Sequence, residues 1–285
     1  MENSIDIQQN EASVLNLPLG RKVTYPKHYS PEVLRFIPRQ IGRTANGIGP
    51  NLPFTGFDCW NAWEFSYLDS HGKPVVRILR LAVPAESENI VESKSLKLYL
   101  NSFNYERFDS DSKIAEAIEK DLSAGFKCSF SLEILPLSGS SALHTAVPAD
   151  KFQCIDCLEV ESPSFKFSAD SLSADQNTDA EEYLYSDLLK SNCPVTSQPD
   201  WGSVFIHYKG KKISRKGLLL YILSFRDINE FHESCAERIF TDIKRICSPE
   251  SLTVQARYTR RGGIDINPLR TDCGEFSLAP RTIRQ

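Results

Sequence analysis

The sequence has 285 residues, of which 41% are hydrophobic and 25% are charged, with a formal net charge of −4. This composition is ordinary for a soluble globular protein, and without an overall basic field we expect no direct contact with nucleic acid. We also expect no membrane partner and a cytoplasmic location, because no apolar run reaches membrane-spanning length and the N-terminus lacks the pattern of a signal peptide.

The first half of the chain is typical of an arm followed by strands and one helix. Residues 1–50 are rich in Pro, Gly and Asn without a sustained period, which predicts an extended N-terminal arm. Aromatic and polar residues then alternate on both sides of the turn Asp69–Lys73, as in a β-hairpin. The expected elements are strands over 57–68 and 74–83, a helix over 112–124, a strand over 126–137, a loop to 149 and a strand over 152–160.

The second half begins with a segment that is unsuited to a core. Residues 166–182 are acidic, small and aperiodic, so we expect a linker or an exposed loop there. Apolar residues at helical spacing follow, among them Ile239 and Ile243. The expected elements are a strand over 201–208, a turn over 210–212, helices over 218–225 and 231–246, a strand over 252–258 and a last strand within 273–283.

An internal repeat organises these elements. Residues 91–103 align without gaps on residues 213–225, with Lys, Leu, Leu, Tyr, Ser and Phe coinciding at six positions. Each copy follows a Trp-containing strand and precedes a second helix and a strand, so we predict two copies of one β-β-α-α-β-β unit. The expected organisation is the arm over 1–50, an N-terminal module over 51–165, the linker over 166–182 and a C-terminal module over 183–285.

The two copies differ where chemistry would lie. Glu92 in the first copy is replaced by Ser214 in the second, and Lys97 by Leu219. The second half in turn carries Cys193 and the cluster 231–235. Because neither half holds a full set of reactive groups, we expect a composite site between the two halves.

The loop Ser191–Asp200 is the strongest candidate for a reaction centre. Cys193 precedes Pro194, and Asp200 follows Pro199, so two prolines restrict the backbone beside both reactive side chains. A cysteine in polar surroundings can act as a nucleophile, and a nearby acid can move its proton. A surface turn with a free thiol is the alternative that this loop alone leaves open.

The cysteines predict thiols rather than disulfides or a metal site. All eight are irregularly spaced, as expected for a reduced cytosolic protein. Cys154 and Cys157 have the spacing of metal ligands, but no second Cys pair or His pair completes a zinc site. We therefore expect no metal.

Four motifs, which follow one another along the chain, now identify a resemblance. They are Glu92–Tyr99, Ser191–Asp200, Phe231–Cys235 and 261–263. Together they resemble the NADPH-dependent 7-cyano-7-deazaguanine reductases of queuosine biosynthesis, in their long two-module form, over roughly residues 15–285. The resemblance implies an α+β fold of two tandem tunnelling-fold modules, each an antiparallel sheet with two helices on one face. It also implies a homodimer.

The resemblance further implies how such an enzyme works. The nitrile of a small 7-deazapurine, 7-cyano-7-deazaguanine, is reduced to the amine of 7-aminomethyl-7-deazaguanine with two NADPH per turnover. Cys193 would first add to the nitrile carbon and form a covalent thioimide, because a bare nitrile is a poor hydride acceptor. Asp200 would protonate the nitrogen, and His232 would orient the substrate or assist proton transfer.

The same resemblance implies residues that bind the substrate. Glu92 and Glu233, one from each module, would accept hydrogen bonds from the donor-rich edge of the deazapurine. His232, Ser93 and Lys94 would line the same pocket.

A cofactor site is implied outside any Rossmann crevice, because no Gly-x-Gly-x-x-Gly opens a βαβ unit. Cations can pair with the cofactor's phosphates, and a glycine permits close backbone approach. The candidates for NADPH binding are Lys94, Ser95, Arg261 and Gly262.

The sequence also allows an oxidative cross-link and other functions. We predict that oxidation links Cys193 to Cys235 and blocks activity reversibly. The alternative functions are a cysteine-dependent nitrile hydrolase and a purine-binding protein of the same fold without turnover. A zinc-dependent GTP cyclohydrolase is disfavoured, because the reaction-loop cysteine has no evident metal partners.

Overall fold

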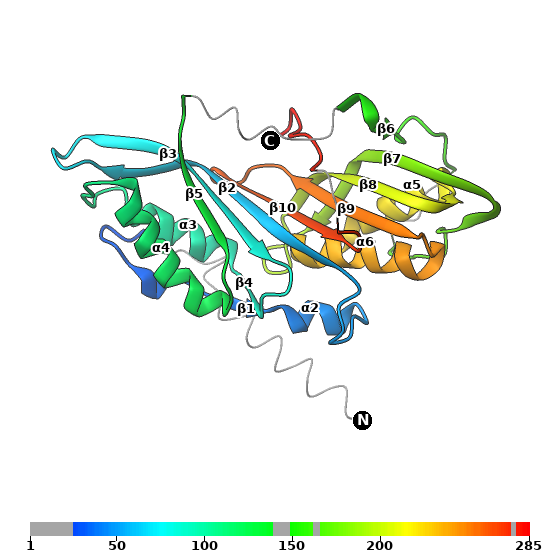
Figure 1. Ribbon diagram of the computed structural model, residues 1–285, viewed down its shortest axis with the longest axis horizontal. Helices are drawn as coiled ribbons and strands as arrows, with labels where there is room; N and C mark the ends of the chain where they lie inside the picture. The colour runs from blue at the N-terminus through cyan, green and yellow to red at the C-terminus, as the bar shows by residue number, and fades with distance from the viewer. Residues whose placement is uncertain (1–24, 139–148, 162–165, 275–277) are drawn as a thin grey trace.

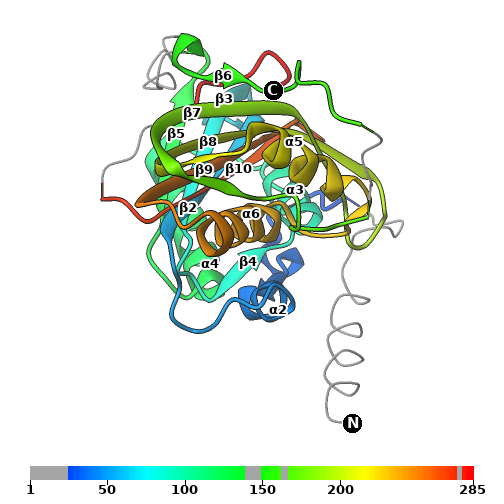
Figure 2. The ribbon, with the colours of Figure 1, turned by 90° about the vertical axis from the view of Figure 1, so that its right-hand side faces the viewer.

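A mixed α+β fold is built on one long sheet, which is described in a computed structural model for residues 25–138, 149–161, 166–274 and 278–285. In these ranges the sheet has eight strands in the order β5-β3-β2-β10-β9-β8-β7-β6, antiparallel except for the short β6–β7 pair. The helices α3 to α6 cover one face of it (Figure 1; Figure 2).

The strands of this sheet are β2 (Thr55–Leu68), β3 (Pro74–Pro84), β5 (Ser131–Pro136), β6 (Gln153–Cys154), β7 (Ala174–Asn192), β8 (Pro199–Ile213), β9 (Ser251–Tyr258) and β10 (Ile264–Thr271). The helices are α2 (Arg39–Ala45), α3 (Ser93–Asn101), α4 (Asp111–Phe126), α5 (Arg215–Leu223) and α6 (His232–Cys247). Short pieces complete the described fold, namely η1 (Pro31–Val33), η3 (Ala149–Lys151), η4 (Ser224–Asp227) and the small sheet of β1 (Phe36–Pro38) with β4 (Asn89–Val91).

The repeated segments form matching helices. In α3 the hydroxyl of Tyr99 donates to Asp121 of α4 at 2.6 Å, and in α5 the hydroxyl of Tyr221 donates to Asp242 of α6 at 2.8 Å. Each tyrosine also meets the last residue of its repeat copy edge to face, with ring centroids 5.3 Å and 5.2 Å apart. The alignment found in the sequence therefore corresponds to the same packing of two helices in both halves.

Each half has its own apolar core, and one strand pair joins them. The first core lies under α3 and α4 and includes Leu96 and Ile118, while the second lies under α5 and α6 and includes Leu218 and Ile239. Strand β10 of the second half pairs with β2 of the first along its whole length, from Ile264 opposite Ala62 to Thr271 opposite Thr55. The sheet is thus continuous across the junction, which places the starts of α3 and α6 near each other.

Several predicted strands and helices are confirmed, but the acidic segment is not a linker throughout. Residues 174–182 form the first part of β7 and pair with β8, whose expected turn over 210–212 is a continuation of the strand. Lys211 lies 2.8 Å from Asp179, and Arg215 lies 2.5 Å from Glu182. Cross-strand charge pairs and the backbone ladder hold such a strand without an apolar face, so hydrophobic patterning missed it.

The N-terminal arm is also more structured than expected. Residues 1–24 and the expected loop residues 139–148 lie outside the described residues, but residues 25–50 contain η1, β1 and α2. Arg39 and Arg43 of α2 are buried, because they pair with carboxylates of the core. Two arginines on an apolar surface gave no hydrophobic period for a sequence prediction to detect.

The other differences concern strand ends. The strand expected over 126–137 is β5 alone, since α4 extends to Phe126, and the strand expected over 152–160 is only β6. Among the described residues the last strand is β10, while residues 275–277 of the strand expected within 273–283 lie outside the described residues. Pro268 lies inside β10 and weakens its pattern as a strand. The described terminal residues instead cover the sheet, where the side chain of Gln285 donates to the Tyr258 carbonyl at 3.2 Å.

Candidate active site

A cleft opens where the two halves meet, with an empty volume of about 670 Å³ that is partly open to solvent. Its wall comes from the first turn of α3, the loop between β7 and β8, the start of α6 and the segment after β9. The cleft gathers six residues that the sequence predicted for the site: Ser93, Cys193, Asp200, His232, Glu233 and Arg261. The structure thus brings these six residues, which come from both halves of the chain, into one cleft.

The reaction loop is closed on itself and presents Cys193 to the cleft. The Cys193 amide donates to the Gln198 carbonyl at 2.9 Å, and the Ser197 amide donates to the Cys193 carbonyl at 2.9 Å. Ser197 has φ 54°, a left-handed conformation that reverses the chain inside this short loop. The side chain of Cys193 is held at the cleft wall with 7% of its surface exposed.

Asp200 is an ionised carboxylate held by two basic side chains. Arg261 donates from Nη1 to its Oδ1, and Nε2 of His232 lies 3.4 Å from its Oδ2. Burial would raise the pKa of Asp200, but His232 and Arg261 together hold that pKa below its usual value. In the free protein Asp200 is consequently suited to accept a proton before it donates one.

His232 begins α6 and is held by an aromatic ring. Its imidazole stacks on Tyr258 of β9, with centroids 3.8 Å apart and an angle of 16° between the planes. The stack fixes the plane of the imidazole, while Asp200 orients one of its nitrogens. His232 is thus placed to exchange protons with Asp200 and with a molecule in the cleft.

Glu92 and Glu233 differ in what their carboxylates already bind. Glu92 is the N-cap of α3 and accepts from the amides of Lys94 and Ser95, at 2.7 Å and 2.8 Å. Its burial raises its pKa, which these amides oppose. Burial, with a further effect of Asp58, raises the pKa of Glu233 to about 7. Within the described residues no other side chain donates a hydrogen bond to the Glu233 carboxylate, so that carboxylate has free acceptor capacity.

The four residues predicted to bind the cofactor differ in how their side chains are placed. Ser95 is fully buried, and its hydroxyl donates to the Glu92 carbonyl at 2.7 Å, which leaves it no surface for a ligand. The ammonium group of Lys94 lies 5.2 Å from the ring centroid of Tyr25, outside the cleft wall. Only Arg261 of the four lines the cleft, and Gly262 follows it with φ 60°.

Lys97 is a cleft residue that the sequence reasoning did not assign. It follows Ser93 by one helical turn, and a Cβ on Gly262 would lie 3.4 Å from its Cδ. Burial lowers the pKa of Lys97 to about 8, and nearby Arg261 adds to that shift. Its spacing from Ser93 was a usable signal, because residues four apart share one helix face.

Cys193 and Cys235 are free thiols, and Cys235 is wholly buried, so the oxidative cross-link stays a prediction. Among the described residues, no three His, Cys, Asp or Glu side chains are grouped so as to hold a metal ion. In the same part of the chain, none of the helices has the length and apolar character to cross a membrane.

Comparison with known proteins defines the class first. A family model described as "Nitrile reductase, 7-cyano-7-deazaguanine-reductase N-term" matches residues 25–134, and one described as "QueF-like protein" matches residues 199–275. Each half of the chain thus matches a family model, and the model of the first half is described as that of a nitrile reductase.

Full-length relatives narrow the class to one family. The chain is 49% identical to the NADPH-dependent 7-cyano-7-deazaguanine reductase of Dechloromonas aromatica, covering 94% of this chain and 95% of the relative. Identity is 47% to the enzymes of that name from Desulfotalea psychrophila (94% and 97% covered) and Bordetella bronchiseptica (96% and 100%). The chain belongs to the NADPH-dependent 7-cyano-7-deazaguanine reductase family. A crystal structure of the archaeosine synthase QueF-Like in the apo form is 18% identical over 37% of this chain and 97% of that one, with a TM-score of 0.29, too low to bear on the fold.

Proposed function

We propose that the protein reduces the nitrile of 7-cyano-7-deazaguanine to the primary amine of 7-aminomethyl-7-deazaguanine, with two NADPH per turnover, in tRNA queuosine biosynthesis. Family membership across nearly the whole chain supports the reaction. The single structural observation that carries it is that Cys193, Asp200 and His232 line one cleft. A nucleophile, a proton carrier and a second titratable group are what a nitrile needs for stepwise reduction.

Covalent activation comes first in this mechanism. The sulfur of Cys193 bonds to the nitrile carbon, one C–N π bond opens, and the nitrogen gains a proton, which gives a thioimide. The thiol loses one proton and the nitrogen gains one, so no external acid is required. Because Asp200 is ionised in the free protein, it takes the thiol proton and delivers it to the nitrogen.

Later proton transfers fall to the same pair. NADPH, when bound, supplies the hydride equivalents that the carbon accepts. As the adduct releases the Cys193 thiolate and an imine is left, the nitrogen needs further protons. The imidazole of His232 lies beside Asp200. It can donate a proton to the nitrogen and take up another proton through the Asp200 carboxylate.

Substrate recognition uses the two glutamates in different ways. Glu233 has unused acceptor capacity and lines the cleft, so it is the primary acceptor for the N–H groups of the deazapurine edge. Glu92 is only 1% exposed and is not among the residues that line the cleft, but each of its oxygens uses one lone pair to cap α3, which leaves capacity for one more donor from the ligand. Ser93 lies in the cleft wall beside this cap, and Lys94 follows it on the rim of the first turn.

The cation group beside the cleft fits the phosphates of NADPH. Burial and the nearby Arg261 lower the pKa of Lys97, and an anion bound between these two cations would offset their repulsion. Gly262 lies next to the Lys97 side chain and leaves its backbone open to a phosphate oxygen. We assign the phosphates to Lys97, Arg261 and Gly262, with Lys94 further out, and give Ser95 a structural role only.

Two tandem tunnelling-fold modules account for the repeat. The matched Tyr–carboxylate contacts of α3–α4 and α5–α6 support this reading, with the second module starting at Ala174 because β7 is one strand. We propose that two chains form a homodimer, which light scattering after size exclusion tests. All eight cysteines are free thiols, which supports a reducing, cytosolic location.

One experiment tests the reaction directly. The protein is incubated with 7-cyano-7-deazaguanine alone, and intact mass is expected to rise by one substrate mass. NADPH is then added, and the amine is expected with two cofactors oxidised per product. A nitrile hydrolase would yield amide or acid without cofactor oxidation, and a binding protein would yield no product.

A further inference from the structure

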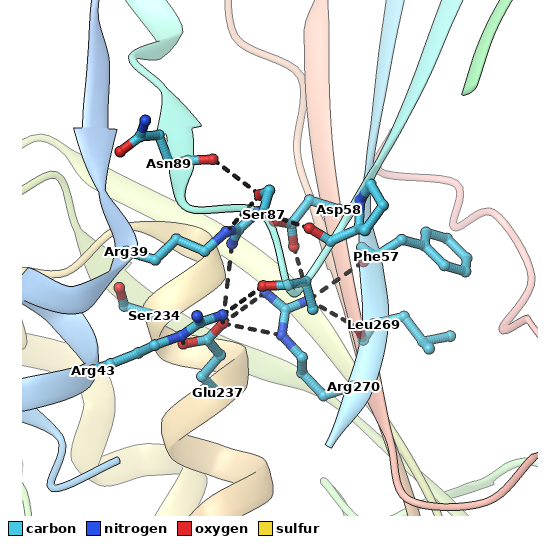
Figure 3. A network of polar contacts seen from close by, with 12 residues as sticks. Arg39, Arg43, Phe57, Asp58, Ser87, Asn89, Ser234, Glu237, Leu269 and Arg270 are labelled. Carbon is cyan, nitrogen blue, oxygen red and sulfur yellow. Dashed lines mark hydrogen bonds and ion pairs between the residues drawn. The ribbon is translucent and has the colours of Figure 1, made fainter. Parts of the chain in front are cut away.

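A buried cluster of charges lies directly behind the active cleft. Arg39 and Arg43 of α2, Arg270 of β10, Asp58 of β2 and Glu237 of α6 contact one another with almost no exposure to solvent (Figure 3). The pairing joins elements of both halves, because Arg270 reaches Asp58 at 2.8 Å and Glu237 at 3.1 Å. Three cations face two anions, so the cluster carries an excess positive charge.

Arg39 is the member whose hydrogen-bonding capacity is not filled. Its Nε donates to the Ser87 hydroxyl at 2.9 Å, and its Nη2 donates to Asp58 at 2.6 Å. Within the part of the chain that the structure describes, its buried Nη1 has no hydrogen-bond partner, and it lies 3.9 Å from Glu237. Arg43, by contrast, bonds Glu237 through two nitrogens and also the Ala85 carbonyl.

Glu233 faces this cluster from the substrate side. It lies on α6 one turn before Glu237, and it lines both the active cleft and a second cavity of about 760 Å³ behind it. Arg39 lines that second cavity too. The charged groups around Glu233 are Arg39 from α2, Asp58 from β2, His232 and Glu237 from α6, and Glu230 just before α6.

The charge of Glu233 decides whether it can hold the substrate. A deazaguanine edge presents two N–H donors side by side, and only an ionised carboxylate accepts both. Burial and Asp58 favour the neutral acid, while Arg39 and His232 favour the anion. The arginine keeps its charge throughout the pH range in which proteins are folded, so its effect on Glu233 is permanent.

We propose that Arg39 is a positioning residue for substrate recognition, which keeps the Glu233 carboxylate ionised between the two cavities. This inference rests on the proposed function, since it assigns Glu233 to the deazapurine edge. It explains why an arginine with an unfilled N–H is buried behind the cleft. In this arrangement the Glu233 carboxylate, which lies in the binding site, is the counterion for the excess positive charge of the cluster.

The test compares pH profiles of kcat/KM for 7-cyano-7-deazaguanine. In Arg39→Gln we expect the acidic limb to move up by roughly one pH unit, so that kcat/KM falls about tenfold at about pH 6 and approaches wild type at about pH 8.5. The loss should lie in KM, with kcat at saturation nearly unchanged. Arg39→Lys, which keeps the charge, should restore most of the acidic limb.

Arg43→Gln is the matched control, because it removes a cation of the same cluster that does not line the second cavity. It should lower the melting temperature without moving the acidic limb. An unmoved limb in Arg39→Gln, or an equal shift in Arg43→Gln, would overturn the inference. Wild-type turnover measured beside them separates the two claims, because its failure would refute the proposed reaction instead.

A milder variant keeps the test decisive if Arg39→Gln does not fold. Ser87→Ala removes the acceptor of the Arg39 Nε at little change in volume. Its acidic limb should move in the same direction by a smaller amount, and a profile identical to wild type would overturn the inference.

Discussion

Arg261 donates a hydrogen bond from Nη1 to Oδ1 of Asp200, which links a residue assigned to the cofactor with the residue assigned to proton transfer. Burial opposes ionisation of Asp200, yet His232 and Arg261 hold its pKa below the usual value. A phosphate that drew Arg261 away would weaken this hold and raise the pKa. Binding of cofactor would then convert Asp200 from a proton acceptor toward a proton donor, in the order that the chemistry requires.

Replacing Arg261 tests this link. In Arg261→Gln the pKa of Asp200 rises, so a larger fraction is protonated and cannot take the thiol proton at low pH. The rate of adduct formation without NADPH should therefore fall at acidic pH and recover as pH rises, which rapid-quench intact mass measures. Arg260→Gln is the control, because Arg260 lies over Trp63 and outside the cleft. A pH-independent loss would argue against the link.

The covalent step depends on one sulfur. Cys193→Ala should form no adduct with 7-cyano-7-deazaguanine and should lose activity by about a thousandfold or more, as expected for removal of a nucleophile. Cys235→Ala serves as the control, because Cys235 is fully buried and does not line the cleft. That variant should still gain one substrate mass. Retained turnover in Cys193→Ala would exclude covalent activation by this residue.

Much of this site followed from local signals in the sequence. The repeat placed α3 and α5 in matching positions, and the two prolines marked the loop that carries Cys193 and Asp200. These features depend on residues close together in the chain. Such features can be predicted from the apolar faces of helices, from capping residues and from turn residues.

What the sequence did not reveal depends on long-range pairing. Strand β10 contains a proline and is recognisable only from its partners β2 and β9, and the acidic start of β7 depends on basic residues more than twenty positions away. From the sequence alone Arg39 would be expected at the surface, because its partners Asp58 and Ser87 lie far from it in the chain. Charge pairs of this kind leave no period in the sequence, because their partners come from other elements.

Lys97 should make cofactor binding sensitive to alkaline pH. Its pKa is lowered to about 8, so the protonated form that pairs with phosphate is lost above that pH. The kcat/KM for NADPH should then fall about tenfold per pH unit above about pH 8. Lys97→Arg, whose charge does not titrate there, should flatten this limb, and Lys97→Met should be weak at every pH. A wild-type profile level from about pH 7 to about pH 9 would contradict the assignment.

The internal repeat makes a matched prediction for stability. Tyr99 and Tyr221 each donate to a carboxylate of the following helix, and both rings are fully buried. Tyr→Phe at either position removes that hydrogen bond and keeps the ring, so the free energy of unfolding should fall by about 1–2 kcal/mol in each case. Urea unfolding monitored by circular dichroism measures both values. Because the two sites lie in separate cores, the double variant should lose the sum of the two single losses. A loss confined to Tyr99 or to Tyr221 would show that the two halves do not use this contact equally, and would weaken the case for two equivalent modules.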